Sequence, residues 1–410
     1  MSNKDLLPVA DAQRRIVDAV PVLPAEQIPV AAALGRVLAE DVAARRSQPP
    51  MPVSAMDGYA VRAEDVETLP ATLHIIGYAP AGHAYDGTVG RNEAVRIFTG
   101  APVPNGADTI VIQENTEADG ENVRVVDGKA PTGRFVRPAG LDFAEGDVLL
   151  KAGKVLTARD VGLAAAMNIP WLMVHRKPRI SILATGDEIV MPGDPIGRDQ
   201  IVSSNALALS AFIAATGGEP IDLGIAPDEE DGLRTLASGA RGSDILVTTG
   251  GASVGDHDLV QSVLGDIGLE VDFWRIAMRP GKPLMFGGLG DSYLIGLPGN
   301  PVSSLVCAVM FLAPAIRKML GMTEIDPPKR TALLDGDLEE NDEREDYLRA
   351  TLSVADDGTV RAKPYSRQDS SMFATIARSD ALIVRAPFAP AAKGGDRVDY
   401  IPLEGSLYSI

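Results

Sequence analysis

The segment ILVTTGGASVGDHD, from Ile245 to Asp258, decides the fold of this 410-residue chain. Its first four residues are apolar or β-branched, which is typical of a strand buried on both faces of a parallel sheet. The glycines and small residues that follow predict a tight loop whose backbone N–H groups can face a polar or anionic ligand. Asp256 or Asp258 is the expected N-cap of a helix that begins near Leu259. We therefore expect a ligand-binding loop at the carboxyl end of a central strand.

Predicted strands and helices alternate on both sides of this segment, which indicates βαβ units and a doubly wound parallel sheet. Asp228 is the expected N-cap of one helix, and Asn300 with Pro301 marks the start of another. Three loops, TGDE, TTGGASVGDHD and LPGNPVSS, each follow a predicted strand. Because the carboxyl ends of parallel strands meet at one edge of a sheet, we expect these loops to lie together.

The rest of the chain predicts smaller units around this α/β domain. Short alternating strands between about residues 71 and 139 indicate a small antiparallel barrel or sandwich, and alternation returns beyond residue 326. The predicted division is a mixed N-terminal domain (1–46 and 140–176), an inserted β domain (47–139), an α/β domain (177–326) and a C-terminal β domain (327–410). The fold class is thus multidomain α/β plus β.

Composition excludes several functional classes. The formal net charge of −18 opposes nucleic acid and anionic membranes as bulk partners, because the long-range field repels phosphate. Any anionic substrate must therefore be met by local cations, backbone N–H groups or a divalent metal. The single cysteine, Cys307, excludes an internal disulfide. The apolar stretch 305–316 is too short for a membrane span, and no signal peptide is evident, so we expect a cytoplasmic protein.

Charged residues near the predicted sheet edge form two groups of opposite sign. The acids are Asp187, Glu188, Asp228, Asp256 and Asp258, and the bases are Arg275, Arg279 and Lys282. Carboxylates bind Mg²⁺ together with substrate phosphate, and arginines hold oxyanions with a bidentate fork. The alternative is structural: the acids cap helices and the bases pair with them. No GxGxxG, GxxxxGK[ST], HExxH, GxSxG or CxxC motif occurs, so nucleotide loops and the common hydrolase sites are not supported.

In sequence order, the chain contains SAMDGYAVR, IFTGAPVPNGADTIV, RPAGLD, TGDE, TTGGASVGDHD, RPGKP and GLPGNPVS. This series resembles the molybdopterin molybdenumtransferase family, the MoeA and gephyrin E-domain group of molybdenum cofactor biosynthesis. The resemblance implies insertion of molybdate into the dithiolene of adenylylated molybdopterin, with Mg²⁺-dependent release of AMP. It also implies a MogA-like α/β domain and an elongated homodimer with the active site in a cleft between subunits. Transient contacts with a molybdopterin adenylyltransferase and with apo-molybdoenzymes are implied as well.

The resemblance further implies two sets of functional residues. The catalytic set is Asp57, Asp142, Glu188, Asp228 and Asp258. The substrate-binding set is Thr99, Gly250, Gly251, Ser253, Arg275, Arg279, Lys282, Pro298, Pro301, Ser303, Arg344 or Arg349, and Ser371. Which carboxylate holds the metal stays unknown.

Some positions depart from the family pattern. Arg275 and Arg279 stand where lysine is common, which keeps the charge but changes the geometry. Phe135 and Leu141 replace polar residues near Asp142. Three alternatives therefore stay open: a molybdopterin-binding paralogue without insertase activity, a scaffold protein, and a molybdopterin adenylyltransferase.

Overall fold

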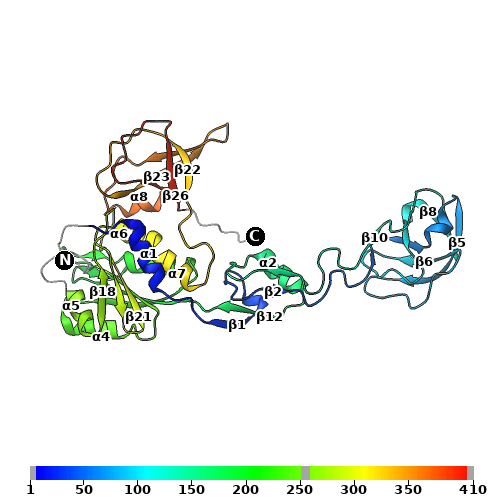
Figure 1. Ribbon diagram of the computed structural model, residues 1–410, viewed down its shortest axis with the longest axis horizontal. Helices are drawn as coiled ribbons and strands as arrows, with labels where there is room; N and C mark the ends of the chain where they lie inside the picture. The colour runs from blue at the N-terminus through cyan, green and yellow to red at the C-terminus, as the bar shows by residue number, and fades with distance from the viewer. Residues whose placement is uncertain (1–5, 251–258, 404–410) are drawn as a thin grey trace.

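The computed structural model of the protein describes residues 6–250 and 259–403. The chain is elongated, with a small β domain at one end and a narrow middle region beside it (Figure 1). The α/β domain lies at the other end and carries the C-terminal domain on one side. The predicted class, multidomain α/β plus β, is confirmed.

The α/β domain is built on a six-stranded sheet with strand order β16-β13-β17-β21-β20-β18. The strand of the segment that decides the fold lies between two parallel neighbours, and all five of its residues are buried. The strands of the sheet are β13 (Arg179–Thr185), β16 (Glu219–Ala226), β17 (Ile245–Thr249), β18 (Leu269–Phe273), β20 (Met285–Leu289) and β21 (Ser292–Leu297).

Two strands of this sheet are antiparallel, which the alternation of strands and helices did not predict. Gly290 and Asp291 alone connect β20 to β21, and a two-residue connection can join only antiparallel strands. Strand β18 continues the antiparallel edge beside β20. The four strands β16, β13, β17 and β21 form the parallel part that was expected.

Helices cover both faces of the sheet and enclose two apolar cores. One core joins the sheet to α1, α3 and the continuous run α6, η4 and α7, and the other joins it to α4 and α5. The bounds are α1 (Val9–Ala19), α3 (Asn205–Ala215), α4 (Glu230–Ser238), α5 (Leu259–Asp266), α6 (Pro301–Cys307), the π-helix η4 (Ala308–Leu312) and α7 (Ala313–Met319). A two-stranded ribbon, β14 (Ile189–Val190) with β15 (Ile201–Val202), lies outside the sheet.

The helical run Pro301–Met319 is longer than the apolar stretch suggested. Its 19 residues reach the length and apolarity that a membrane span requires, and it is the one such run among the described residues. However, 78% of its most apolar window is buried inside the protein. Its residues pack against α1 and α3, so it is the core helix of the α/β domain.

The middle region is formed by chain segments that come from both sides of the β domain. Its two ribbons each pair an early strand with a late one, and helix α2 covers them. The elements are β1 (Ala25–Pro29) with β12 (Trp171–His175), β2 (Val42–Ala43) with β11 (Val148–Leu150), η1 (Val30–Ala32) and α2 (Ala158–Ala166). Helix α1 lies elsewhere than the predicted division placed it, because Ala12 and Ile16 are buried in the α/β core. The other predicted domain boundaries stay a prediction.

The β domain is a six-stranded sheet with strand order β7-β4-β6-β5-β9-β8. Strands β5 and β6 are parallel, in contrast to the antiparallel expectation, because the long connection 80–92 lets the chain return to the starting end. Its elements are β4 (Gly58–Val61), η2 (Ala63–Val66), β5 (Ala71–Ala79), β6 (Glu93–Ile97), β7 (Thr109–Ile112), η3 (Gln113–Asn115), β8 (Thr116–Asp119) and β9 (Asn122–Val125). The short pair β3 (Val53–Ser54) and β10 (Val136–Arg137) connects this sheet to the middle region.

The C-terminal domain is a closed barrel. Strands β23, β24, β22, β26 and β25 follow one another around it, and β25 pairs back to β23. The elements are β22 (Arg330–Leu334), β23 (Glu345–Val354), β24 (Val360–Pro364), α8 (Phe373–Ala377), β25 (Ala381–Arg385) and β26 (Arg397–Pro402). Strand β19 (Met278–Arg279) of the α/β domain adds to β23 and so ties the two domains together.

Candidate functional site

Three loops meet at the carboxyl edge of the parallel strands, as the sequence predicts. Gly250 follows β17 with φ +93°, and a Cβ there would lie 2.7 Å from the carbonyl oxygen of Thr185 at the end of β13. A Cβ on Gly299, after β21, would lie 3.7 Å from the Cα of Gly250. These contacts show how closely the three strand ends approach. The predicted residues Gly251, Ser253 and Asp258 lie outside the described residues.

Three exposed carboxylates surround this edge. The backbone N–H of Asp228 donates a hydrogen bond of 3.1 Å to the Oδ1 atom of Asp187, which links the loops after β13 and β16. Glu188 folds over Gly186, where a Cβ would lie 2.4 Å from its Oε2 atom. Asp228 is not the predicted N-cap: α4 begins one residue later, with Glu229 as the N-cap and no capping side chain. Its carboxylate is therefore not used as a cap.

The third loop leads into α6, with Pro301 at the first turn as predicted. Pro298 is buried before it, and Asn205 fixes the loop by donating a hydrogen bond of 2.7 Å to the carbonyl oxygen of Gly299. Ser303, on the first turn of α6, is only 5% exposed. The backbone N–H of Val302 donates to the carbonyl oxygen of Ser370. The C-terminal barrel therefore contacts the start of α6 beside the predicted Ser371.

Arg349, on β23, reaches toward this contact from inside the barrel. It is 1% exposed, and it forms no ion pair with any described residue. Its Nη2 donates a 3.1 Å hydrogen bond to the carbonyl oxygen of Asp369, whereas its Nε is buried without a described partner. Burial lowers the pKa of Arg349, although a guanidinium stays protonated at neutral pH. A buried cation with an unsatisfied N–H is suited to an anionic ligand.

A second group of predicted residues lies in and beside the β domain. The Oδ1 atom of Asp57 accepts two hydrogen bonds from Thr99, from its N–H at 2.7 Å and from its hydroxyl at 2.8 Å. These two bonds lower the pKa of Asp57, and the charge of Arg96 adds to the effect. Asp57 is therefore a fixed, ionised carboxylate at neutral pH.

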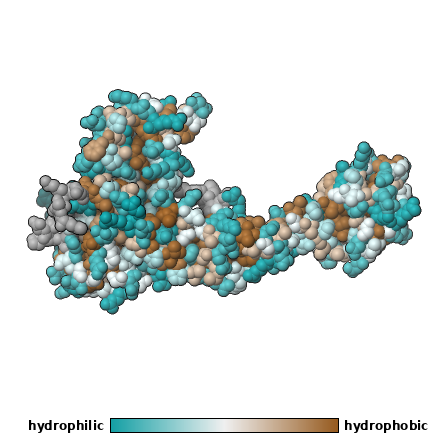
Figure 2. Space-filling model, in the orientation of Figure 1, coloured by the Kyte–Doolittle hydropathy of each residue, from teal (hydrophilic) through white to brown (hydrophobic). Residues whose placement is uncertain are grey.

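Asp142 lines a cavity of 710 Å³ at the joint between the β domain and the middle region. We call it the joint pocket. Gly100, next to Thr99, also lines it, and so does Gln48, whose carbonyl oxygen accepts a hydrogen bond of 2.9 Å from the N–H of Asp142. Hydrophobic residues gather on this narrow stretch of the molecule (Figure 2). Asp57, Thr99 and Asp142 thus belong to one local region.

The two groups lie at opposite ends of the chain. Strand β10, beside the joint pocket, is next to the β domain, whereas β21 and α6 are in the α/β domain beyond the middle region (Figure 1). The structure therefore brings the predicted residues together as two half-sites: the joint half-site (Asp57, Thr99, Asp142) and the edge half-site (Glu188, Asp228, Gly250, Pro298, Pro301, Ser303).

Known families match the chain in three successive parts. Residues 7–168 match the MoeA N-terminal region, domains I and II. Residues 181–318 match a probable molybdopterin binding domain, and residues 331–403 match the MoeA C-terminal region, domain IV. The two half-sites fall in the first and second of these regions.

Relatives match over almost the whole chain. The molybdopterin molybdenumtransferase of a Nostoc species is 36% identical over 389 residues, which are 92% of this chain and 89% of the relative. The chain belongs to the MoeA family. A Haemophilus influenzae molybdopterin molybdenumtransferase is 31% identical over 98% of the chain and 100% of its own length. A crystal structure of the MoeA molybdopterin biosynthesis protein from Pyrococcus horikoshii has a TM-score of 0.85 at 31% identity, with 98% and 100% coverage.

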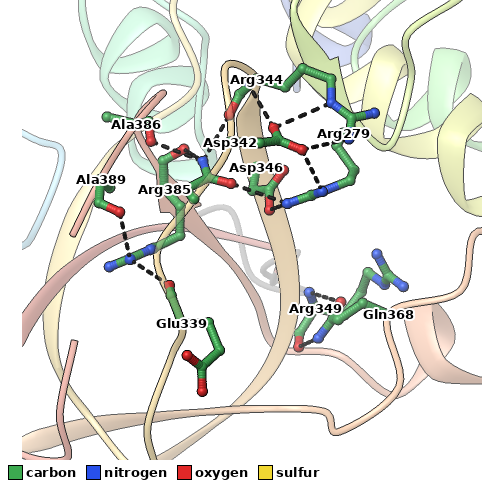
Figure 3. Close-up of polar contacts among 11 residues, drawn as sticks. Arg279, Glu339, Asp342, Arg344, Asp346, Arg349, Gln368, Arg385, Ala386 and Ala389 are labelled. Carbon is green, nitrogen blue, oxygen red and sulfur yellow. Dashed lines mark hydrogen bonds and ion pairs between the residues drawn. The ribbon is translucent and has the colours of Figure 1, made fainter. Parts of the chain in front are cut away.

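In this MoeA-family chain, Arg279 is bound to the C-terminal barrel (Figure 3). Its guanidinium donates to Asp342 at 2.9 Å and to Asn341 at 3.1 Å, and it also pairs with Asp346. Its predicted role in substrate binding must therefore share the guanidinium with two carboxylates. Lys282 is exposed on the same turn, and Arg275 is half-buried. Arg344 pairs with Asp342 at 2.7 Å, so of the two alternatives Arg349 has the stronger geometry for an oxyanion.

The two carboxylates of this network have opposite pKa shifts. Hydrogen bonding by Arg344 is the main cause that lowers the pKa of Asp342 to about 2. Burial raises the pKa of Asp346 despite its pairing with Arg279. Stability from ionised Asp342 is present above its ordinary pKa of 3.8 and is lost as the pH falls toward about 2. The sequence analysis missed Asp342 and Asp346, which it took as parts of a solvated charge cluster.

We expect Asp346→Ala to destabilise the contact between the α/β domain and the barrel. Asp346 has a 7% exposed side chain, whereas its partner Arg279 is 44% exposed. Removing one partner of a buried pair costs several kcal/mol, and solvent around Arg279 reduces this to about 1 to 3 kcal/mol. Urea unfolding measures the change. The matched control is Asp335→Ala, which removes an exposed pair with Lys363 and should change stability by less than about 0.5 kcal/mol. Equal changes in both variants would contradict this role of Asp346.

Proposed function

We propose that this chain is a molybdopterin molybdenumtransferase that inserts molybdate into the dithiolene of adenylylated molybdopterin. The observation that carries the proposal is the buried, incompletely paired guanidinium of Arg349. Residues 369–371 connect it to the start of α6, because Asp369 accepts its hydrogen bond and Ser370 accepts one from Val302. Molybdate is a tetrahedral dianion, which a protein holds with arginine, hydroxyl groups and backbone N–H groups. The names of the relatives agree with this chemistry.

The reaction proposed here ends in Mg²⁺-dependent release of AMP. Mg²⁺ is bound in proteins through one or two carboxylates plus substrate phosphates rather than through a complete protein cage. Asp187, Glu188 and Asp228 supply carboxylates at one sheet edge, which fits such a site, and no group of three ligands is preassembled in residues 6–250 and 259–403. When bound, the ion would neutralise charge that develops on the phosphoanhydride oxygens. The carboxylates would orient it through their fixed loops.

The active enzyme is proposed to be a homodimer in the cytoplasm. The joint half-site and the edge half-site lie at opposite ends of one chain (Figure 1), so a second copy has to supply the missing half of each site. The two-fold symmetry of a homodimer completes two sites at once. Contacts with a molybdopterin adenylyltransferase and with apo-molybdoenzymes would be transient. Nucleic acid and membrane are not proposed as partners, because the chain carries a net charge of −18.

The test is release of AMP from adenylylated molybdopterin by the purified chain, with and without molybdate and Mg²⁺. We expect release to require both, and the product to activate an apo-molybdoenzyme. Tight binding of the substrate without release would instead identify a binding paralogue or a scaffold. Consumption of ATP together with molybdopterin would identify an adenylyltransferase. Either of these two results would replace the proposal.

A further inference from the structure

The joint pocket contains two arginines that the proposed reaction has not used. Arg46 and Arg137 both line it, together with Asp142. Neither guanidinium forms a hydrogen bond or an ion pair with another residue in the described parts of the chain. Both side chains are exposed to solvent. The pocket therefore offers two cationic groups, with ten N–H donors between them, to a ligand.

The walls that carry these arginines are fixed by backbone pairing. Arg137 lies on β10, directly opposite Val53 of β3. Arg46 precedes Gln48 by two residues, and the N–H of Gln48 donates a 2.9 Å hydrogen bond to the carbonyl oxygen of Phe143. On the far side, the N–H of Gly100 donates to the carbonyl oxygen of Ser54. Because three chain segments are bonded into one frame, the arginines start from defined positions.

The charge of the pocket is opposite to that of the protein. Two arginines against Asp142 leave one net positive charge, in a chain whose formal net charge is −18. A strongly acidic protein repels anions at long range, so an anionic substrate needs local cations where it binds. Arg46 and Arg137 supply such cations beside the joint half-site.

The remaining walls are apolar. Met51 is 47% exposed and Leu141 is 58% exposed, and Pro102 lies between them in the lining. The volume of 710 Å³ is in the usual range for small-molecule sites. Flat apolar side chains beside paired arginines suit a ligand that combines a heterocyclic ring with a phosphate.

We propose that the joint pocket binds a phosphate-bearing heterocyclic end of the substrate, with Arg46 and Arg137 on the phosphate and Met51, Leu141 and Pro102 against the ring. This inference rests on the proposed function, which supplies a substrate with two such ends. One end is the adenylate and the other is the pterin with its phosphate. The shared chemistry is a ring that carries a phosphate, and the experiment below distinguishes the two ends.

The experiment measures binding of two probes, AMP and a pterin monophosphate, to the full-length protein by calorimetry. The variants are Arg46→Ala and Arg137→Ala, and the matched control is Arg45→Ala. Arg45 is an exposed neighbour that does not line the pocket. Each pocket variant should weaken one of the two probes by about tenfold or more, the loss expected for a hydrogen bond to a charged group, while the control binds both probes like the wild type. The probe that weakens identifies the end that is bound.

Equal affinities of the wild type and both pocket variants for both probes would overturn the inference, as would a wild type that binds neither probe. In the AMP-release assay, the pocket variants should raise KM at least tenfold and leave kcat within about twofold, because binding and not chemistry is changed. Failure of the proposed function has a different signature. Probe binding would then still depend on Arg46 and Arg137, but the wild type would release no AMP.

Discussion

Arg349→Met is expected to abolish molybdate-dependent release of AMP while leaving the protein at least as stable as the wild type. The side chain is 1% exposed, and its buried Nε lacks a described partner. Replacing a buried charge with an apolar side chain of similar size is often neutral or stabilises by about 1 to 4 kcal/mol. Losing the charge-assisted bonds to molybdate should lower kcat/KM by about 100-fold or more. Loss of activity and gain in stability would thus come from the same atoms.

Two measurements on the same preparation test this expectation: AMP release over a range of molybdate concentrations, and urea unfolding. Arg361→Met is the matched control, because Arg361 lies exposed on β24, a barrel strand that pairs with β23. It should match the wild type in both measurements. Arg349→Lys keeps the charge but not the planar fork, so it should recover part of the activity at high molybdate. An Arg349→Met protein that is destabilised by 3 kcal/mol or more would assign a structural role to this residue.

The position of Arg349 also shows where the sequence stops predicting the structure. Strand β23 was expected from its alternation, but Asp346, Tyr347, Arg349 and Ala350 are all buried. A strand of a closed barrel that also packs against another domain has two covered faces, so a period of two does not identify its buried residues. The resemblance left Arg344 and Arg349 as alternatives. Only the fold distinguishes them, because Arg344 is paired with Asp342 and Arg349 is not paired.

Local patterns, by contrast, predicted most of the α/β domain. The apolar run at β17, the Pro301 helix start and the glycines after α3 depend on neighbouring residues, and each was found where expected. The antiparallel β20 and β18 depend on a short hairpin that the alternation pattern does not weigh. The ion pairs of Arg279 join residues 63 and 67 positions apart, so no spacing rule could indicate them. Contacts over such separations are decided by tertiary structure.

The separation of the two half-sites leads to the second large effect. Asp57→Asn and Glu188→Gln should each be inactive alone, and a mixture of the two variants after subunit exchange should regain about a quarter of wild-type activity. Asp57 is held by Thr99 in the β domain, whereas Glu188 lies at the sheet edge of the α/β domain. If one chain supplies each half, a mixed dimer contains one site with both defects and one site with none. Half of the dimers are mixed, which gives the quarter.

The decisive control mixes two variants of the same half-site, Glu188→Gln and Asp228→Asn. Both residues belong to the edge half-site of one chain, so every site in a mixed dimer keeps one defect and activity should stay absent. Differently tagged chains, purified over both tags, verify that exchange has occurred. If the mixture of Asp57→Asn and Glu188→Gln also stays inactive after verified exchange, the two half-sites do not complete each other between subunits. The elongated chain would then have to bring its own ends together, which requires the β domain to move past the middle region.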